Sequence, residues 1–302
     1  MKSYFLGANT KNGFYSLYAG FPPGPKDYLR ILKGGPGTGK STLLKAIAAA
    51  AEQRGLPVER VLCSGDPNSL DGVYLPTVAL ALADGTAPHA MEPVLFGVTG
   101  DYLDLGRAFV LPFTEKEKQT LLALQKEHRE QYRLAYELLA QAASLGWNTP
   151  APVPEWSMEA VISALPDREG SGTIRRVFRS AISCEGLLSA DLPPEYQILP
   201  ASPEKIIIAA STLSLRGWSV TLYPSPLDPS QPELLLLPEA SLGFLAATQP
   251  SLPSREPMQQ AISRLRKAKA LHDEMEAFYR PHMDVSVLTE EAQRQIKLIF
   301  PE

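Results

Sequence analysis

The sequence predicts an α/β protein whose parallel sheet is built twice, with long helical arms attached. Three observations support this prediction. An apolar strand over residues 28–32 leads through a glycine-rich loop into a helix of strong helix formers over residues 42–51. Residues 54–89 align without a gap on residues 216–251. A helix-start signal at Thr114 is followed by an apolar repeat of helical period.

The elements follow in order along the chain. Residues 3–17 read as a β-hairpin around the turn formers at 9–13, and strands are expected at 58–63 and 78–83. The expected order of elements is strand, helix, strand, strand, and the strands are near-continuous apolar runs. This pattern predicts a parallel sheet covered on both faces. Thr114 and Glu117 form a capping box that starts a long helix ending near Gly146, which must pack on a partner helix. Further helices are expected at 158–165 and 256–280.

Composition describes an ordinary globular chain of 302 residues, 44% hydrophobic and 21% charged. We place two domains at residues 1–166 and 173–302, on either side of a glycine- and serine-containing linker. The net charge of −4 argues against a nucleic-acid partner, and no apolar run is long enough to span a membrane. With only Cys63 and Cys184, a disulfide framework is excluded, and we predict a reduced, cytoplasmic protein.

Residues 34–41 read Gly-Gly-Pro-Gly-Thr-Gly-Lys-Ser and match G-x-x-x-x-G-K-[ST], the P-loop pattern. A phosphate chain needs many close donors, and glycines let backbone N–H groups turn inward with no Cβ in the way. The helix that starts at Lys40 adds free N–H groups and the positive end of its dipole. The sequence therefore predicts a P-loop NTPase-type fold that binds ATP through Gly34, Gly35, Pro36, Gly37, Thr38, Gly39, Lys40, Ser41 and Thr42.

Two side chains of this region and one acid beyond it are the catalytic candidates. Lys40 is expected to reach the β- and γ-phosphates, and the Ser41 hydroxyl to take a ligand position on Mg²⁺. Asp84 ends an apolar strand, where a Walker-B carboxylate holds Mg²⁺ directly or through water. The alternative is an acid that only opens the Asp84-Gly85 turn. We predict catalytic roles for Lys40 and Asp84, with Ser41 and Asp84 at the metal.

Several other residues allow two interpretations each. Asp71 is a second acidic candidate or a turn residue, and Asp66-Pro67, which recurs as Asp228-Pro229, favours a structural role. His89 contacts phosphate or orients water, or it is solvated in a proline-rich loop. Arg107 is a transition-state cation or a surface residue. A basic run on the helix expected at 256–280 is interpreted either as a contact for phosphate or nucleic acid, or as a solvated helix face. Its members are Arg264, Arg266, Lys267 and Lys269.

The second copy lacks the phosphate-binding sequence. Where the first copy has its glycine-rich loop, residues 200–205 read Pro-Ala-Ser-Pro-Glu-Lys, about five residues shorter and without glycine. Glu204 would repel a phosphate, and Asp84 aligns with Ala246. We predict that the second copy is degenerate and lacks phosphate and metal binding. Its surface is then available to a protein partner.

The order of these segments resembles an uncharacterised bacterial family of tandem P-loop ATPase-like proteins, within the P-loop NTPase superfamily. The resemblance extends over nearly the whole chain. It rests on the hairpin, the P-loop, Asp66-Pro67 with Leu70-Asp71-Gly72, and the segment Asp84-Gly85-Thr86-Ala87-Pro88-His89. The family's second copy often keeps its own P-loop, and this chain departs from the family there.

Three functions remain open at this point. The first is a slow Mg²⁺-dependent ATPase that uses nucleotide to switch conformation; slow, because Gly85 rather than a water-activating Glu follows Asp84. The second is a nucleotide or small-molecule kinase, since the P-loop and Asp84-Gly85-x-x-Pro88 are similar to those of nucleoside monophosphate kinases, although the Arg of their turn is absent. The third is a non-catalytic, nucleotide-gated binding module. ATP is preferred over GTP because no N-K-x-D guanine pocket is readable.

Overall fold

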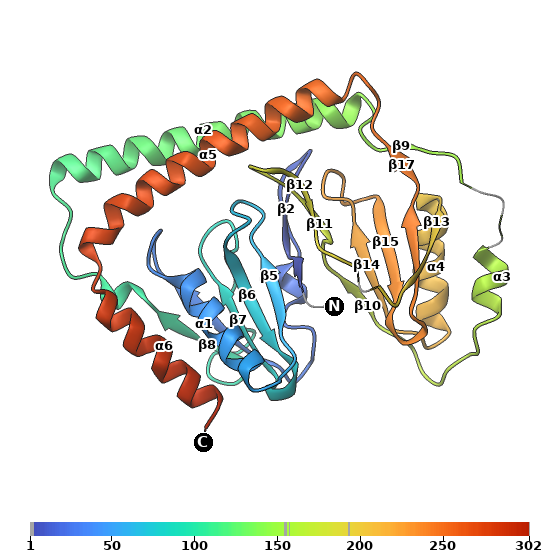
Figure 1. Ribbon diagram of the computed structural model, residues 1–302, viewed down its shortest axis with the longest axis horizontal. Helices are drawn as coiled ribbons and strands as arrows, with labels where there is room; N and C mark the ends of the chain where they lie inside the picture. Colours follow the sequence, from blue (N-terminus) through green and yellow to red (C-terminus); the bar gives the residue numbers. More distant parts are fainter. Residues whose placement is uncertain (1–2, 154–155, 157, 193, 302) are drawn as a thin grey trace.

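A computed structural model describes residues 3–153, 156, 158–192 and 194–301, and it is a mixed α/β structure. Figure 1 shows two sheets side by side, each with a helix on its outer face, and a pair of long helices lying across both. The first sheet carries α1 (Lys40–Gln53) and α6 (Val285–Ile299), and the second carries α4 (Pro203–Leu215). No helix in the described ranges combines the length and apolar character that a membrane crossing requires.

The first sheet has six strands in the order β1-β5-β6-β7-β4-β8. Strand β4 lies between β7 and β8 and is parallel to both, so its carboxyl end meets the ends of β7 and β8 at one edge. The glycine-rich loop leaves the sheet at this edge. The strand bounds are β1 (Ser3–Phe5), β4 (Tyr28–Lys33), β5 (Glu59–Leu62), β6 (Leu70–Leu75), β7 (Leu80–Asp84) and β8 (Gly100–Asp104).

The prediction of an all-parallel sheet was wrong, because β6 runs antiparallel to both of its neighbours. Only residues 63–69 join β5 to β6, and only residues 76–79 join β6 to β7. A parallel connection needs a crossover of about a dozen residues or more, so these short connections force the strand to turn back. The hairpin predicted at 3–17 is also shorter than expected: residues 3–5 enter the sheet as β1, and the hairpin comprises β2 (Gly7–Thr10) and β3 (Gly13–Ser16).

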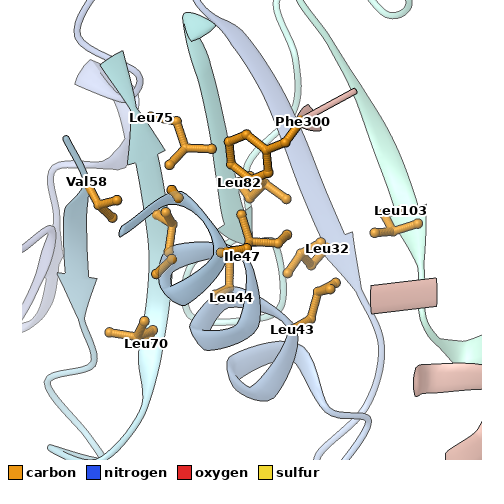
Figure 2. Close-up of a cluster of buried hydrophobic side chains, with 14 of the residues drawn as sticks. Leu32, Leu43, Leu44, Ile47, Val58, Leu70, Leu75, Leu82, Leu103 and Phe300 are labelled. Atoms are coloured by element: carbon orange, nitrogen blue, oxygen red, sulfur yellow. The ribbon is translucent and has the colours of Figure 1, made fainter. Parts of the chain in front are cut away.

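Helix α1 packs on one face of the first sheet, against the side chains that alternate residues of the strands direct toward it. Leu44 and Ile47 are completely buried against Leu32, Val73 and Leu82, and α6 closes the same core from the side (Figure 2). The helix ends at Gln53, with Arg54 as its C-cap, and Gly55 follows with a φ of 68°, which suits glycine just after a helix end. This packing fixes the amino end of α1 at the sheet edge where β4 ends.

The second sheet has the order β10-β14-β15-β16-β13, the same order and directions as β1-β5-β6-β7-β4. Backbone details coincide as well, since Ala79 and Ser241 both follow a 3₁₀ turn with positive φ. A second hairpin, β11–β12, corresponds to β2–β3. The bounds are β10 (Ile174–Arg176), β11 (Ser180–Ser183), β12 (Gly186–Ser189), β13 (Gln197–Ala201), β14 (Val220–Pro224), β15 (Pro232–Leu237) and β16 (Leu242–Ala246).

The inner faces of the two sheets share one apolar core. Leu29, Ile31 and Tyr74 of the first sheet belong to the same buried cluster as Tyr223 and Leu234 of the second. The halves are also joined through the backbone, since Phe5 and Phe178 exchange both of their N–H···O bonds at 2.8 Å. The Arg175 guanidinium donates to the Glu59 carboxylate at 2.7 Å across the same junction.

The long helices are α2 (Glu115–Ser144) and α5 (Arg255–Tyr279), and they pack along each other (Figure 1). The capping box of Thr114 and Glu117 is confirmed, as are the expected extents of both helices. The small residues Ala135, Ala142 and Ala261 are buried in their interface. The remaining elements are α3 (Met158–Ser163), β9 (Thr149–Pro150), β17 (Thr248–Gln249) and the 3₁₀ turns Tyr18–Gly20, Pro76–Val78, Gly106–Ala108, Pro238–Ala240 and Arg280–His282.

Candidate functional site

The glycine-rich loop joins the carboxyl end of β4 to the first turn of α1. Gly37 and Gly39 have φ values of 69° and 77°, a conformation that suits glycine far better than any residue with a Cβ. A Cβ on Gly34 would lie 2.4 Å from Thr38 Oγ1, which itself donates to the Gly35 carbonyl at 2.9 Å. The loop is therefore wound so tightly that its glycines cannot be replaced without rearrangement.

Lys40, the first residue of α1, folds back over this loop. Its ammonium donates to the carbonyls of Gly34 and Gly35 at 3.0 and 2.8 Å and lies 3.7 Å from Asp84 Oδ2. Leu32 of β4 is paired with Asp84 of β7, which explains why the acid reaches the base of the loop. The lysine and the acid for which the sequence predicted catalytic roles are thus brought together.

The Asp84 carboxylate makes the contacts that its turn interpretation requires, and its other oxygen faces the loop. Oδ1 accepts hydrogen bonds from the Thr86 N–H and hydroxyl at 2.8 and 2.6 Å, which is the chemistry of a turn. Oδ2 faces Lys40 instead. The two roles are compatible, because the turn orients one oxygen while the other faces the loop.

Ser41 lies on α1 with its hydroxyl oxygen accepting the N–H of Leu70 at 2.9 Å. The described residues contain no group of three or more His, Cys, Asp or Glu side chains arranged to hold a metal ion. A P-loop magnesium does not need such a group, since it takes one serine or threonine oxygen and one acid, with phosphate oxygens and water as the other ligands. Ser41 and Asp84 fit that donor set, and Ser41 keeps its hydroxyl proton and one lone pair free of Leu70.

A buried polar cluster lies next to Asp84 on the neighbouring strand. Asp71, on β6, accepts from the Tyr18 hydroxyl at 3.2 Å and is 3.3 Å from His89 Nε2. Burial raises the pKa of Asp71, with a smaller contribution from the nearby Asp84 carboxylate, while His89 acts in the opposite direction. His89 is 8% exposed and lies between the rings of Phe14 and Tyr18, so the interpretation as a solvated loop residue was wrong.

The carboxyl-terminal turn of α5 lies directly on the glycine-rich loop. A Cβ on Gly37 would be 3.3 Å from the Glu276 backbone oxygen, and one on Gly35 would be 3.0 Å from the Tyr279 ring. Leu288 of α6 contacts the loop in the same way, 3.4 Å from the Cβ position of Gly39. The loop is therefore enclosed by two helices that come from the other end of the sequence.

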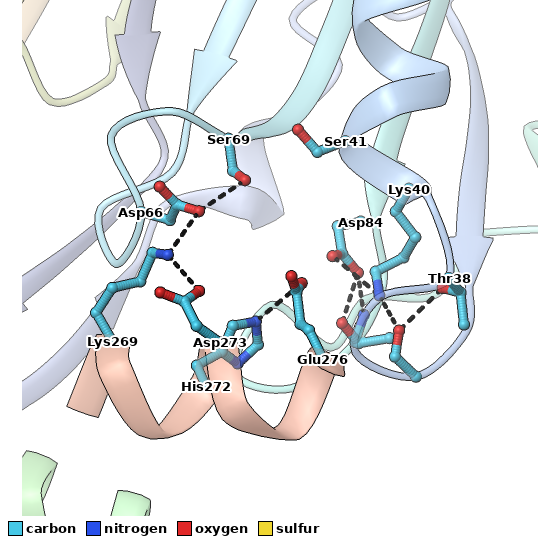
Figure 3. Close-up of polar contacts among 12 residues, drawn as sticks. Thr38, Lys40, Ser41, Asp66, Ser69, Asp84, Lys269, His272, Asp273 and Glu276 are labelled. Atoms are coloured by element: carbon cyan, nitrogen blue, oxygen red, sulfur yellow. Dashed lines mark hydrogen bonds and ion pairs between the residues drawn. The ribbon is translucent and has the colours of Figure 1, made fainter. Parts of the chain in front are cut away.

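Glu276 puts a carboxylate against the loop's backbone. It lies 3.4 Å from His272 Nε2, and His272 and the Gly37 N–H both lower its pKa, His272 more strongly. Figure 3 shows this side chain rising from α5 into the space between the Asp66–Ser69 turn and Lys40. A negative group thus lies beside a donor of the loop that the sequence predicted to bind phosphate.

Three of the remaining sequence candidates, Lys269, Asp66 and Arg107, have structural partners. Lys269 lies 3.4 Å from Asp66 and 2.5 Å from Asp273, so this member of the basic run joins α5 to the turn beside the loop (Figure 3). Asp66 also accepts from Ser69 Oγ at 3.1 Å, as its predicted structural role requires. Arg107 is paired with the buried Glu291 of α6 and is therefore held away from the loop.

Sequence reasoning did not find His272, Glu276 or Tyr279 as parts of this site. Their helix was predicted, but its pattern carries no information about which distant loop its end contacts. The spacing of His272 and Glu276 places them on one helix face, which is too common a pattern to identify a site.

Comparisons with known proteins returned nothing: no family model, no curated protein and no solved structure matches the chain. The site is interpreted from its own geometry. It consists of a tight loop at a helix amino end, a lysine facing an acid, a serine beside them, and a carboxylate from α5 on the loop's N–H group.

Proposed function

We propose that the chain binds ATP with Mg²⁺ at residues 34–42, hydrolyses it slowly, and uses the bound nucleotide to reposition α5. The observation that carries this proposal is the packing of α5 on the loop at Gly37, with the Glu276 carboxylate beside the Gly37 N–H, which lowers its pKa. Helix amino ends and glycine-rich turns favour anions because their free N–H groups converge. A carboxylate beside an N–H group of the loop supports an anion-binding role for that loop.

Each loop residue has a defined task in this proposal. Backbone N–H groups of the loop hold the phosphates, and Lys40 exchanges its two loop carbonyls for β- and γ-phosphate oxygens. Ser41 and Asp84 hold Mg²⁺, which neutralises charge on the phosphates when it is bound. Water attacks the γ-phosphate, the bond to the β-phosphate oxygen breaks, and ADP and inorganic phosphate leave.

Turnover is expected to be slow because the residue after Asp84 is Gly85, where faster ATPases of this type carry an acid that activates water. Asp71 and His89 do not replace it in this conformation, since His89 is buried between two rings and directed at Asp71. We assign this pair the task of positioning β6 and the Asp84 turn.

The nucleotide must displace Glu276, because two anions cannot share the same N–H group. Glu276 belongs to α5, whose other end lies along α2 and contacts the second half of the chain through the cluster that includes Ile182 and Leu227. Movement of Glu276 therefore reaches the second half through a continuous helix, which is the basis for the proposed switch.

We further propose that the chain arose by duplication of a P-loop unit and belongs to the tandem P-loop ATPase-like family that its motifs resemble. Support comes from the shared strand order and from the coincident positive φ of Ala79 and Ser241. Phe5 and Phe178 are equivalent positions and bond to each other reciprocally, as residues on a two-fold axis do. The second half lacks the loop, because β13 ends at Ala201 and α4 begins at Pro203.

Release of inorganic phosphate from ATP and Mg²⁺ tests this function. We expect slow, steady release by the native chain and none above background by Lys40→Ala. ADP formation that depends on an added nucleotide or alcohol acceptor, with the phosphoryl group transferred to that acceptor and no inorganic phosphate released, would instead support the kinase. Nucleotide that stays bound without turnover would support the gated binding module.

A further inference from the structure

The space around Gly85, the residue that follows Asp84, is already filled. A Cβ at this position would lie 2.2 Å from Ile31 Cγ2 and 3.2 Å from Lys33 Nζ. Ile31 is completely buried, so a larger residue at position 85 would require the core to move. Packing therefore excludes a water-activating acid at this position, and an ammonium group lies where its side chain would begin.

That ammonium belongs to Lys33, the last residue of β4, which immediately precedes the glycine-rich loop. Ile31, two residues earlier and on the same face of the strand, belongs to the core between the two sheets, so Lys33 points away from α1. Its Nζ donates to the Gly85 carbonyl at 3.1 Å. On the other side, Lys40 Nζ lies 3.7 Å from Asp84 Oδ2. The consecutive residues Asp84 and Gly85 are thus each approached by a lysine, one from each end of the loop.

The contacts of Lys33 are weak enough for a phosphate to replace. Its side chain is 35% exposed and lies 3.7 Å from the carboxylate of Glu92, which is 70% exposed. Ion pairs this open to solvent contribute little to stability. The Tyr102 ring, 5.5 Å from Nζ, supports the ammonium from one side. A phosphate oxygen is a stronger acceptor than the neutral Gly85 carbonyl, because both partners of the new hydrogen bond carry charge.

We propose that Lys33 contacts the γ-phosphate of bound ATP and stabilises the charge on it during hydrolysis. The assignment rests on the proposed function. In phosphoryl transfer the charge is spread over the oxygens of the transferred group, and a cation beside them lowers the barrier. The sequence suggested Arg107 for this task, but Arg107 is paired with the buried Glu291. Lys33 keeps its protons throughout and exchanges the Gly85 carbonyl for a phosphate oxygen.

The same contact makes the site selective for a triphosphate. ADP lacks the γ-phosphate, so Lys33 adds to the affinity for ATP and not to the affinity for ADP. A lysine that only holds the Gly85 turn in place would affect both nucleotides alike. The ratio of the two affinities therefore separates contact with the phosphate from a structural role.

Calorimetric titration of ADP and of a slowly hydrolysed ATP analogue, each with Mg²⁺, tests the proposal. Lys33→Met removes the charge and keeps the apolar stem, and Lys33→Gln also retains an N–H donor, which guards against a variant that does not fold. We expect the Kd of the analogue to rise by about tenfold or more in both variants. The Kd of ADP should stay close to the native value, and phosphate release from ATP should fall. The matched control is Lys26→Met, at an exposed lysine ahead of β4.

The possible failures can be told apart. An unchanged Kd of the analogue in the folded variants, or an equal loss of affinity for ADP and the analogue, would overturn the role of Lys33 and leave the nucleotide site in place. A native chain that binds neither nucleotide would overturn the proposed function, and this assignment with it.

Discussion

Glu276→Gln is predicted to tighten ATP binding. The Glu276 carboxylate lies beside the Gly37 N–H, which lowers its pKa, and the proposed nucleotide must displace it. The glutamine side chain has nearly the same shape and can still face this N–H with its amide oxygen. The substitution therefore removes the charge and leaves the packing of α5 on the loop in place.

The expected magnitude follows from the contact. An N–H group interacts more favourably with a charged partner than with a neutral one by about 1 kcal/mol, so moving the residue 276 side chain away from the Gly37 N–H becomes easier by about that amount. Removing the repulsion between carboxylate and phosphate adds a contribution of the same order. A total of about 1–2 kcal/mol corresponds to a Kd roughly 5- to 30-fold lower.

Isothermal titration calorimetry with a slowly hydrolysed ATP analogue and Mg²⁺ measures this change. Glu274→Gln is the matched control, because Glu274 is exposed on the same helix two residues away, and its Kd is expected to stay within twofold of the native value. Equal or weaker binding by Glu276→Gln, with Lys40→Ala still unable to bind, would refute the idea that Glu276 competes with the phosphates.

Three other predictions concern stability and chemistry. Leu44→Ala removes a completely buried side chain from the core beneath the loop and should lower the free energy of unfolding by about 2–5 kcal/mol in urea titrations; a loss below about 1 kcal/mol would contradict this packing. Burial beside His272 lowers the pKa of His128 from 6.5 to about 4. As the pH is lowered, His128 is therefore protonated in the unfolded chain before it is protonated in the folded one, and the free energy of unfolding should decrease from pH 6.5 to pH 4. His128→Leu should reduce that slope in urea titrations across this range, and an unchanged slope would exclude His128 as its source. Asp84→Asn keeps an acceptor for Thr86 but removes the charge facing Lys40, so phosphate release should fall at least tenfold with the fold intact; unchanged release would leave Asp84 with only its turn role.

The parts of the site that lie close together in the sequence were predictable. The glycine-rich loop, Lys40 and Ser41 are consecutive, and the strand and helix around them follow from local apolar patterns. Asp84 was recognised because it ends a strand, and strands parallel to β4 end at the same sheet edge. The capping box of α2 was found for the same reason, since its two residues are three positions apart.

The parts set by long-range packing were not predictable. Strand β6 was missed because Asp71-Gly72 reads as a turn, and its strand conformation is stabilised by burial of all six of its residues between β5 and β7. Glu276 was missed because nothing local determines that the end of α5 contacts the loop. The pairing of Asp71 with His89 depends in the same way on how the loop after β7 folds over Tyr18.

Nucleotide binding at the glycine-rich loop is the central claim, and calorimetric titration of Mg²⁺ and the ATP analogue into native and Lys40→Ala chains tests it most directly. The account predicts saturable binding with one nucleotide per native chain and no measurable binding by a folded Lys40→Ala chain. Absence of binding in both the native and the Glu276→Gln chains would contradict it, and so would equal binding by native and Lys40→Ala chains.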